Sequence, residues 1–201
     1  MFFRLISRLS LAALFVAAGF PAFSQVVPAA RVGGPPLVVG VGISDFSTDF
    51  GPASRWRMEG ISAWVDYYPQ HLPSFLRGLG VEFVGHDINY NRPAVLPRMR
   101  QDTGEGGAIY TWRHFRNFRP YAKYVAGIGS IDFPPYGVYD HDTRSVMSPG
   151  GGAEYRVLGN IWVRGDYEYQ TWGLLWGSPN HLTPNGFTIG ASYDFRHMHR
   201  Y

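Results

Sequence analysis

The chain has 201 residues, among them 25 Gly, 13 Tyr, 14 Phe and 6 Trp, and no stretch keeps a sustained helical periodicity of apolar residues. This composition favours one β-rich domain over an α/β fold. Because there is no Cys, disulfides, Cys-ligated metal sites and a lipid-modified cysteine anchor are excluded. The formal charge of +3 is too small to recommend nucleic acid as a partner.

The amino-terminal residues have the pattern of a secretory signal. Arg4 and Arg8 precede an apolar run over residues 9–20, and residues 22–24 form a small-x-small cleavage site. We therefore predict a cleaved signal peptide over residues 1–24, with an uncleaved anchor as the alternative. As an anchor the apolar run is short, because spanning a bilayer takes roughly 20 residues. Without Arg4 and Arg8 the chain is nearly neutral.

Residues 25–36 are rich in Pro, Ala, Val and Gly, which predicts a flexible mature amino terminus. From residue 37 to residue 196, segments follow in which apolar residues alternate with polar residues or Gly. Alternate side chains of a β-strand point to opposite faces, so each segment predicts a strand with one apolar face. In chain order the segments are 37–46, 57–67, 79–90, 103–114, one that begins after Pro120, 148–157, 161–172 and 185–196.

The segment 161–172 has the most pronounced contrast between its faces. Ile161 and Val163 lie on one side, and Arg164 and Asp166 lie on the other. Each of the eight segments is about long enough to cross a bilayer at a tilt, which takes roughly 9 to 11 residues.

The connections between the segments differ in length. Four long, polar or Pro/Gly-rich connections follow the odd-numbered segments, at 47–56, 91–102, 134–147 and 173–184. Short turns follow the fourth and sixth segments, whereas residues 68–78 after the second form a long exception. Long loops on one side and short turns on the other are typical of an outer-membrane β-barrel.

Aromatic residues lie near both predicted ends of the segments. Two such groups resemble the aromatic girdles at the membrane interfaces, although aromatic residues also pack the cores of soluble proteins. The residues that we assign to the girdles and to the assembly signal are Trp112, Trp162, Trp172, Tyr193 and Phe195.

The last segment carries a family resemblance. Residues 190–195, Gly-Ala-Ser-Tyr-Asp-Phe, resemble the closing strand of small outer-membrane β-barrel proteins, the family with OmpA-type and OmpX-type membrane domains and opacity-type porins. The resemblance covers residues 37–195 and implies export to the cell outer membrane and recognition by its assembly machinery. Family members usually end at this Phe, whereas here residues 196–201 follow. Either Tyr201 is the terminal aromatic residue, or 197–201 form a periplasmic tail and recognition uses an internal signal.

The fold class expected from pattern and resemblance is all-β: an eight-stranded antiparallel up-and-down transmembrane barrel with four long outer loops and three inner turns. Every backbone amide in hydrocarbon must be paired within the protein, which requires a closed sheet. The apolar face then contacts lipid. The residues predicted to face lipid are Val39, Val41, Ile43, Ile61, Val65, Val81, Phe83, Ile128, Val163 and Ile189.

The opposite faces carry charges of both signs. Eight strands enclose an interior that side chains fill, and charges buried there must be paired or hydrated. The residues predicted to form this interior network are Glu82, Glu105, Arg113, Lys123, Glu154, Arg156, Arg164, Asp166 and Glu168. We expect Gly on the same faces to make room for the Arg side chains, and a polar lumen that is largely plugged.

Few groups of residues have the types needed for catalysis or for binding metal ions or phosphate. His141, Asp142 and Ser145 include the residue types of a catalytic triad, but spacing within a loop does not fix its geometry. His197 and His199 on the tail could bind a metal weakly. Four acidic residues near the outer rim could bind the divalent cations that bridge lipopolysaccharide, and three Arg could pair with its phosphates. Ordinary solvation explains them as well. They are Asp45, Asp49, Asp87, Asp102, Arg92, Arg98 and Arg100.

The function expected from these features is structural, with surface interactions and at most limited passage of small solutes. We predict no catalytic residue, no cofactor and no metal site, and a monomer whose partners are membrane lipid, lipopolysaccharide and the assembly machinery. One alternative is a soluble periplasmic or secreted carrier, in which the apolar faces would line a ligand cavity. A second is an outer-membrane lipid-modifying enzyme. The ligand, the conductance and the loop conformations cannot be read from the sequence.

Overall fold

The computed structural model describes residues 35–49, 55–90, 99–132, 141–173 and 181–196. The predicted signal peptide over 1–24, most of the predicted flexible segment 25–36 and the tail 197–201 lie outside the described residues. In the described part of the chain no helix has both the length and the apolar composition needed to cross a membrane.

The described residues form nine strand segments and one short 3-10 helix. The strands are β1 (Leu37–Asp49), β2 (Arg55–Tyr67), β3 (Leu79–Tyr90), β4 (Met99–Thr111), β5 (Phe118–Asp132), β6 (His141–Leu158), β7 (Ile161–Tyr169), β8 (Thr171–Trp172) and β9 (Asn185–Asp194). The 3-10 helix, Ser74–Leu76, lies in the connection 68–78, whose unusual length the sequence shows.

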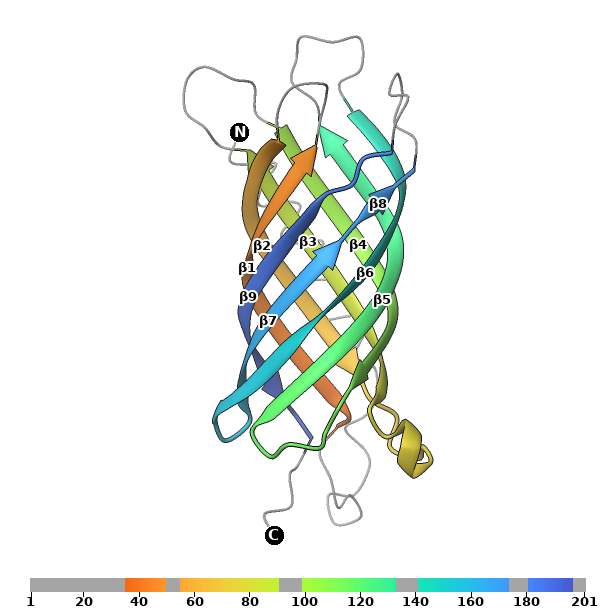
Figure 1. The fold of residues 1–201 in the computed structure, drawn as a ribbon, viewed down its shortest axis with the longest axis vertical. Helices are drawn as coiled ribbons and strands as arrows, with labels where there is room; N and C mark the ends of the chain where they lie inside the picture. Colours follow the sequence, from red (N-terminus) through yellow and green to blue (C-terminus); the bar gives the residue numbers. More distant parts are fainter. Residues whose placement is uncertain (1–34, 50–54, 91–98, 133–140, 174–180, 197–201) are drawn as a thin grey trace, which may run out of the picture. The chain divides into compact units, whose positions relative to one another are not determined.

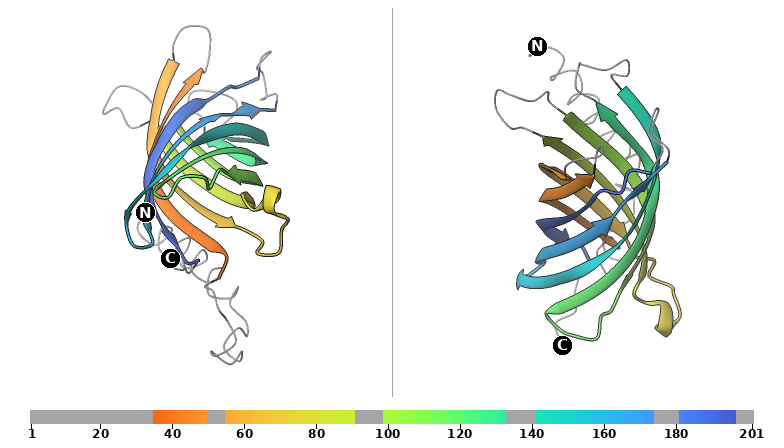
Figure 2. Two further views of the ribbon diagram at one scale, coloured as in Figure 1. Left: turned by 60° about the horizontal axis from the view of Figure 1, so that its bottom comes forward. Right: turned by 45° about the horizontal axis from the view of Figure 1, so that its top comes forward.

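The strands close into an antiparallel barrel in chain order, with each strand tilted across the barrel wall (Figure 1). β7 and β8 occupy one position, because both pair with β6 and only Gln170 separates them. Closure comes from β1 and β9, whose register pairs Val38 with Asp194 and Ser47 with Asn185. The predicted eight-stranded up-and-down barrel is confirmed. Both further views show the same continuous wall around a central axis (Figure 2).

The tightest turn joins β6 to β7. Leu158 pairs with Ile161, and Gly159 between them has a φ of 51°. Two-residue hairpin turns match the twist of the strands when their central residues adopt positive φ, which Gly does without a steric cost. The turn therefore fixes the register in which β7 presents its charged face to the interior.

The two faces of the wall differ as the alternation predicts. Every residue predicted to face lipid has its side chain on the outside, with exposed fractions from 37% to 70%. Residues between them in sequence are buried, including Glu82 and Arg164 at 0% and 1% exposure. Contact of the outer face with lipid remains a prediction that the exposure supports.

The interior is not uniformly polar, which differs from the prediction. Toward the end of the barrel at which β1, β3 and β5 end, inward side chains form an apolar cluster that we call the outer apolar cluster. Its members are Phe46, Met58, Ile88, Met99, Ile131, Val146, Trp172 and Leu182. A smaller group at the other end contains Val38, Tyr68, Ile109 and Tyr121. The ion pairs of Lys123 and Arg164 lie between these two groups.

Several strands are longer than predicted, so the long connections are shorter. β6 begins at His141 and pairs with β5 as far as Asp132, although residues 134–147 were expected to be a loop. Similarly, β1 extends to Asp49 and β4 begins at Met99. Outward residues in these extensions, such as His141 and Thr143, are polar. An alternation of apolar residues therefore stops before the strands do.

Two inward Gly make room for tryptophan, where Arg had been expected. A Cβ atom on Gly40 would lie 2.3 Å from the ring of Trp64, and one on Gly129 would lie 2.2 Å from the ring of Trp172. Any larger residue at these positions would displace an indole that fills the lumen.

Candidate functional site: the ion-paired barrel interior

The centre of the barrel holds one ammonium surrounded by carboxylates. Lys123 extends from β5, and its Nζ atom lies 2.8 Å from Glu82 Oε1 on β3. It also forms ion pairs with Asp166 and Glu168 on β7. The four side chains are between 0% and 5% exposed. The cluster therefore links strands on different sides of the lumen.

Arg164 forms the second cationic centre. Its Nη2 atom lies 2.5 Å from Glu82 Oε2, and its Nη1 atom lies 3.4 Å from Asp66 Oδ2 on β2. The Arg164 Nε atom donates to the hydroxyl of Tyr121 at 2.7 Å. The guanidinium also lies 4.8 Å from the ring centroid of Trp64, which is within the range of a cation–π contact.

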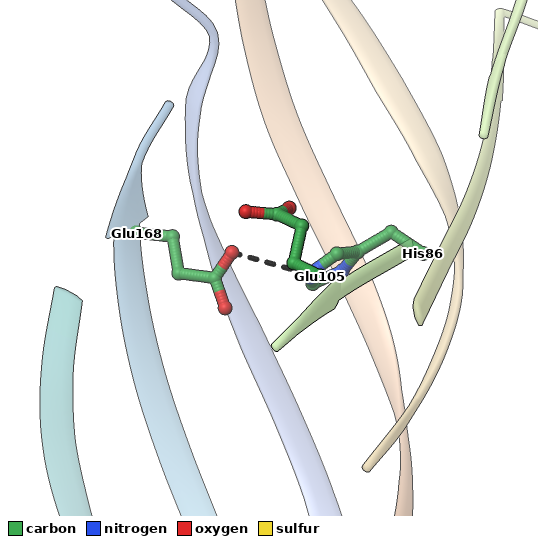
Figure 3. A group of neighbouring side chains, drawn as sticks. All are labelled: His86, Glu105 and Glu168. Atoms are coloured by element: carbon green, nitrogen blue, oxygen red, sulfur yellow. Dashed lines mark ion pairs between the residues drawn. The ribbon is translucent and has the colours of Figure 1, made fainter. Parts of the chain in front are cut away.

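A third group lies beside these centres and shares Glu168 with them. His86 Nε2 on β3 is 3.1 Å from Glu168 Oε2, and Glu105 on β4 is adjacent (Figure 3). Ser62 Oγ lies 2.6 Å from His86 Nδ1, and Ser148 donates to Glu105 Oε2. The group thus combines an imidazole and two carboxylates, all buried.

Arginines gather at the short-turn end of the barrel. Arg119 Nη1 donates to Asp194 Oδ2 at 2.9 Å, and Arg196 Nη2 donates to the same oxygen at 2.6 Å. The Arg119 guanidinium lies 3.6 Å from the ring centroid of Trp162. Burial disfavours the charge on Arg196, but the hydrogen bonds to Asp194 together with the charges of Asp194, Tyr68 and Glu154 outweigh burial and raise the pKa of its guanidinium. These contacts tie Arg196, two residues beyond β9, to the barrel.

Most residues of the predicted interior network lie inside the barrel. They are Glu82, Glu105, Lys123, Glu154, Arg164, Asp166 and Glu168, each at most 6% exposed.

The predicted interior position is wrong for Arg113, and Arg156 lies on the inner face but at the end of the barrel. β4 ends at Thr111, so the alternation no longer continues at Arg113, which is exposed and lies over the ring of Tyr68 at 4.6 Å. Arg156 precedes the β6–β7 turn and pairs with the interior Trp162 in register, but it is partly exposed and donates from Nε to the carbonyl of Gly159 at 2.9 Å. Both lie at the end of the barrel.

Among the described residues, five buried acidic, basic or histidine side chains are missing from the predicted network: Asp66, His86, Arg119, Asp142 and Asp194. Asp66 and Asp194 alternate with outward apolar residues, so the period-two pattern could have identified them. His86 follows the less regular part of β3, where Val84 is also buried.

The girdle assignment is wrong for two of the five aromatic residues. Trp162 and Trp172 are fully buried inside the barrel, whereas Trp112, Tyr193 and Phe195 are exposed. Trp162 alternates with Ile161 and Val163, which places it on the charged face. The girdle assignment considered only the position of each aromatic residue along the barrel axis and not the face on which the alternation places it.

The structure does not bring His141, Asp142 and Ser145 together as a catalytic triad. His141 is exposed, with Nδ1 2.6 Å from Asp132 Oδ1, whereas Asp142 is buried on the opposite face of β6. At the same end, Arg57 pairs with Asp45, and Arg100 pairs with Asp87 and Asp102 at 3.0 Å each. The side chain of Asp49, and Arg92 and Arg98, lie outside the described residues, as do His197 and His199.

A family model described as the outer membrane protein beta-barrel domain matches residues 10–195 of the chain. The chain belongs to this outer-membrane β-barrel family. Its localisation is therefore the bacterial outer membrane. The soluble-carrier alternative is wrong, because it needs the charged faces outside and the apolar faces inside.

Solved structures of outer-membrane proteins share the fold. Neisserial surface protein A matches with a TM-score of 0.67 and 12% identity, over 82% of this chain and all 100% of its own. The attachment invasion locus protein Ail of Yersinia pestis matches with a TM-score of 0.58 and 15% identity, over 81% of this chain and 99% of its own. No curated protein sequence matches this outer-membrane barrel.

Proposed function

We propose that this outer-membrane barrel is a monomeric, non-catalytic protein that anchors surface connections and contacts the cell envelope, with at most limited passage of small solutes. The apolar outer face holds the barrel in the bilayer. The interior closes it, and the connections at the end of the outer apolar cluster contact the surroundings.

The ion-paired centre is the observation that carries this proposal. Lys123 on β5 contacts β3 and β7, while Arg164 on β7 contacts β2 and β3. A barrel of eight strands is just wide enough for its side chains to fill. Charges paired across such a lumen leave little room for a continuous water path.

The outer apolar cluster supports closure from the other end. Phe46, Ile131 and Trp172 come from three different strands and are all fully buried in it. Apolar packing excludes water, so hydrated ions meet this cluster before they reach the charged centre. The outer apolar cluster and the ion-paired centre thus form two successive barriers along the barrel axis.

The outward ion pairs at the same end support contact with lipid headgroups. Arg57 and Arg100 lie next to the apolar band, where guanidinium groups can form paired hydrogen bonds with lipopolysaccharide phosphates. At the other end, the exposed Tyr193 and Phe195 are the residues that we propose for recognition by the assembly machinery.

Planar-bilayer recordings test the closed lumen. The purified barrel should give no large, stable conductance, because both barriers block the axis. A large, stable conductance from a preparation of folded monomers would contradict the proposal. Mass spectrometry of lipid A, with and without expression, tests the alternative of a lipid-modifying enzyme, for which we expect unchanged lipid A.

A further inference from the structure

Two sets of three interior side chains share Glu168, and only one of them already surrounds a cation. Glu82, Asp166 and Glu168 all pair with the ammonium of Lys123. In the second set, His86 and Glu105 join Glu168, and among the described residues Glu105 has no ion pair with Lys or Arg. The second set therefore offers ligand atoms without a side-chain cation between them.

The geometry of the second set resembles a metal-binding arrangement. The ligand atoms of His86, Glu105 and Glu168 all lie within 4.8 Å of one another, and His86 Nε2 is 3.1 Å from Glu168 Oε2 (Figure 3). Two ligands about 2.0–2.1 Å from one Zn²⁺ in a tetrahedral site lie roughly 3.4 Å apart. Glu105 lies within 4.8 Å of both His86 and Glu168 and would supply the third ligand atom.

An unsatisfied buried oxygen is the second observation at this site. Glu105 is 5% exposed, and its Oε1 atom has no hydrogen-bond partner among the described residues. Its other oxygen accepts from Ser148, which holds the side chain in place. A buried polar atom without a partner costs about 1–3 kcal/mol, and more when charged, so a bound cation would remove this cost.

A hydroxyl chain orients the imidazole. Thr188 Oγ1 lies 2.7 Å from Ser44 Oγ, which contacts Ser62 Oγ, and Ser62 Oγ lies 2.6 Å from His86 Nδ1. When His86 Nδ1–H donates to Ser62, the lone pair of Nε2 points toward the carboxylates. Metal-binding His residues normally have such a partner on the other ring nitrogen.

The balance of buried charge also favours a cation. Among the described residues, the buried acidic side chains are Asp66, Glu82, Glu105, Asp142, Glu154, Asp166, Glu168 and Asp194, whereas the buried Lys and Arg are Arg119, Lys123 and Arg164. Arg144 and Arg196 offset Asp142 and Asp194 at the two ends. The middle of the lumen keeps an excess of carboxylates, and buried charge without compensation is strongly destabilising.

We propose that His86, Glu105 and Glu168 bind one divalent transition-metal ion inside the barrel. One imidazole with two carboxylates suits Zn²⁺ and its neighbours, whereas Ca²⁺ and Mg²⁺ prefer oxygen ligands alone. The ion would connect β3 and β4 to β7 across the lumen. This site is separate from the proposed surface role, and either proposal can fail without the other.

Zinc binding by the full chain in detergent tests the site. The tag-free protein should carry the changes H197Q and H199Q, because the two tail histidines could bind Zn²⁺ by themselves. After removal of metal with a chelator and addition of Zn²⁺, elemental analysis should find one ion per chain. We expect H86Q and E105Q to lose this ion, and S62A to bind it roughly 10–100-fold more weakly.

Glu154→Gln is the matched control, because Glu154 is a buried carboxylate outside the three ligands. It should keep one ion per chain. Zinc retained at full stoichiometry by folded H86Q or E105Q, or no stoichiometric ion in the parent protein, would overturn the proposal. X-ray absorption of the zinc-loaded parent needs no ligand variant to fold. A shell with one imidazole and carboxylate oxygens at about 2.0–2.1 Å supports the site, and a shell without imidazole refutes it.

Discussion

Replacing Lys123 by Met should destabilise the barrel strongly while keeping its packing. Met has nearly the length of Lys but no charge, so the change removes the cation and leaves Glu82, Asp166 and Glu168 close together. At an effective dielectric constant of about 20, unit charges 2.8 Å apart attract by roughly 6 kcal/mol. Burying the ammonium costs several kcal/mol, which offsets most of this attraction.

The net loss of stability depends on which cationic partners the three carboxylates retain. Arg164 still contacts Glu82 and lies 3.5 Å from Asp166, and His86 still contacts Glu168. Breaking a buried ion pair by removing one partner costs about 3–5 kcal/mol. Because the remaining partners compensate in part, we expect a loss of about 3–4 kcal/mol in the free energy of unfolding.

Urea unfolding of the barrel in lipid vesicles, followed by tryptophan fluorescence and by heat-modifiable gel mobility, measures this loss. The double change K123M with D166N removes one of the buried carboxylates that lost its cation and should recover part of the stability. A loss below about 1 kcal/mol for K123M, or no recovery in the double variant, would show that the three carboxylates do not depend on Lys123 for compensation.

Two further substitutions separate the faces of the wall. Ile189→Arg should destabilise the barrel by about 2–4 kcal/mol near the bilayer midplane or block insertion, whereas E168Q on the inner face should affect insertion much less; folding yields in vesicles compare them, and equal yields would remove the support for the face assignment. Trp172→Ala should cost about 3–5 kcal/mol in urea unfolding, because the fully buried indole fills the outer apolar cluster, and exposed Trp112→Ala should cost far less. Equal costs for the two tryptophans would contradict the interior position of Trp172.

The sequence was sufficient for the fold because one property, the period-two alternation, has one physical cause. Ile161 and Val163 must leave the interior when Arg164 and Asp166 enter it, and the structure places each pair on the expected face. The bounds of β3 agree with the prediction at both ends. This alternation, together with the difference between long connections and short turns, is compatible with few topologies.

Strand ends were harder to predict, since the outward residues change from apolar to polar while the ladder continues. Residues 141–147 pair with β5 through backbone hydrogen bonds, which do not depend on side-chain type. The same limit explains Arg113, where the predicted strand continued beyond Thr111. A pattern of apolar residues reports the hydrophobic band and not the hydrogen-bonded length.

The partners inside the barrel could not be predicted from the sequence. Lys123 and Glu82 are 41 residues apart, and Arg164 and Asp66 are 98 residues apart. Their contact depends on the stagger of several strands, and an error of two residues in any register would pair different charges. His86 illustrates the difficulty, because nothing near it in sequence indicates that Glu105 and Glu168 will lie beside it.

The pairing of the first strand with the last has a consequence for biogenesis. Val38 meets Asp194, so the seam joins the two extremes of the folded segment, and the loop-closure entropy for this contact is among the largest that the chain can have. Such non-local contacts slow folding and leave unpaired edges exposed in the meantime. A nascent molecule lacking β9 would be an open sheet whose β1 and β7 edges are unpaired, and unpaired strand edges favour aggregation in the aqueous periplasm.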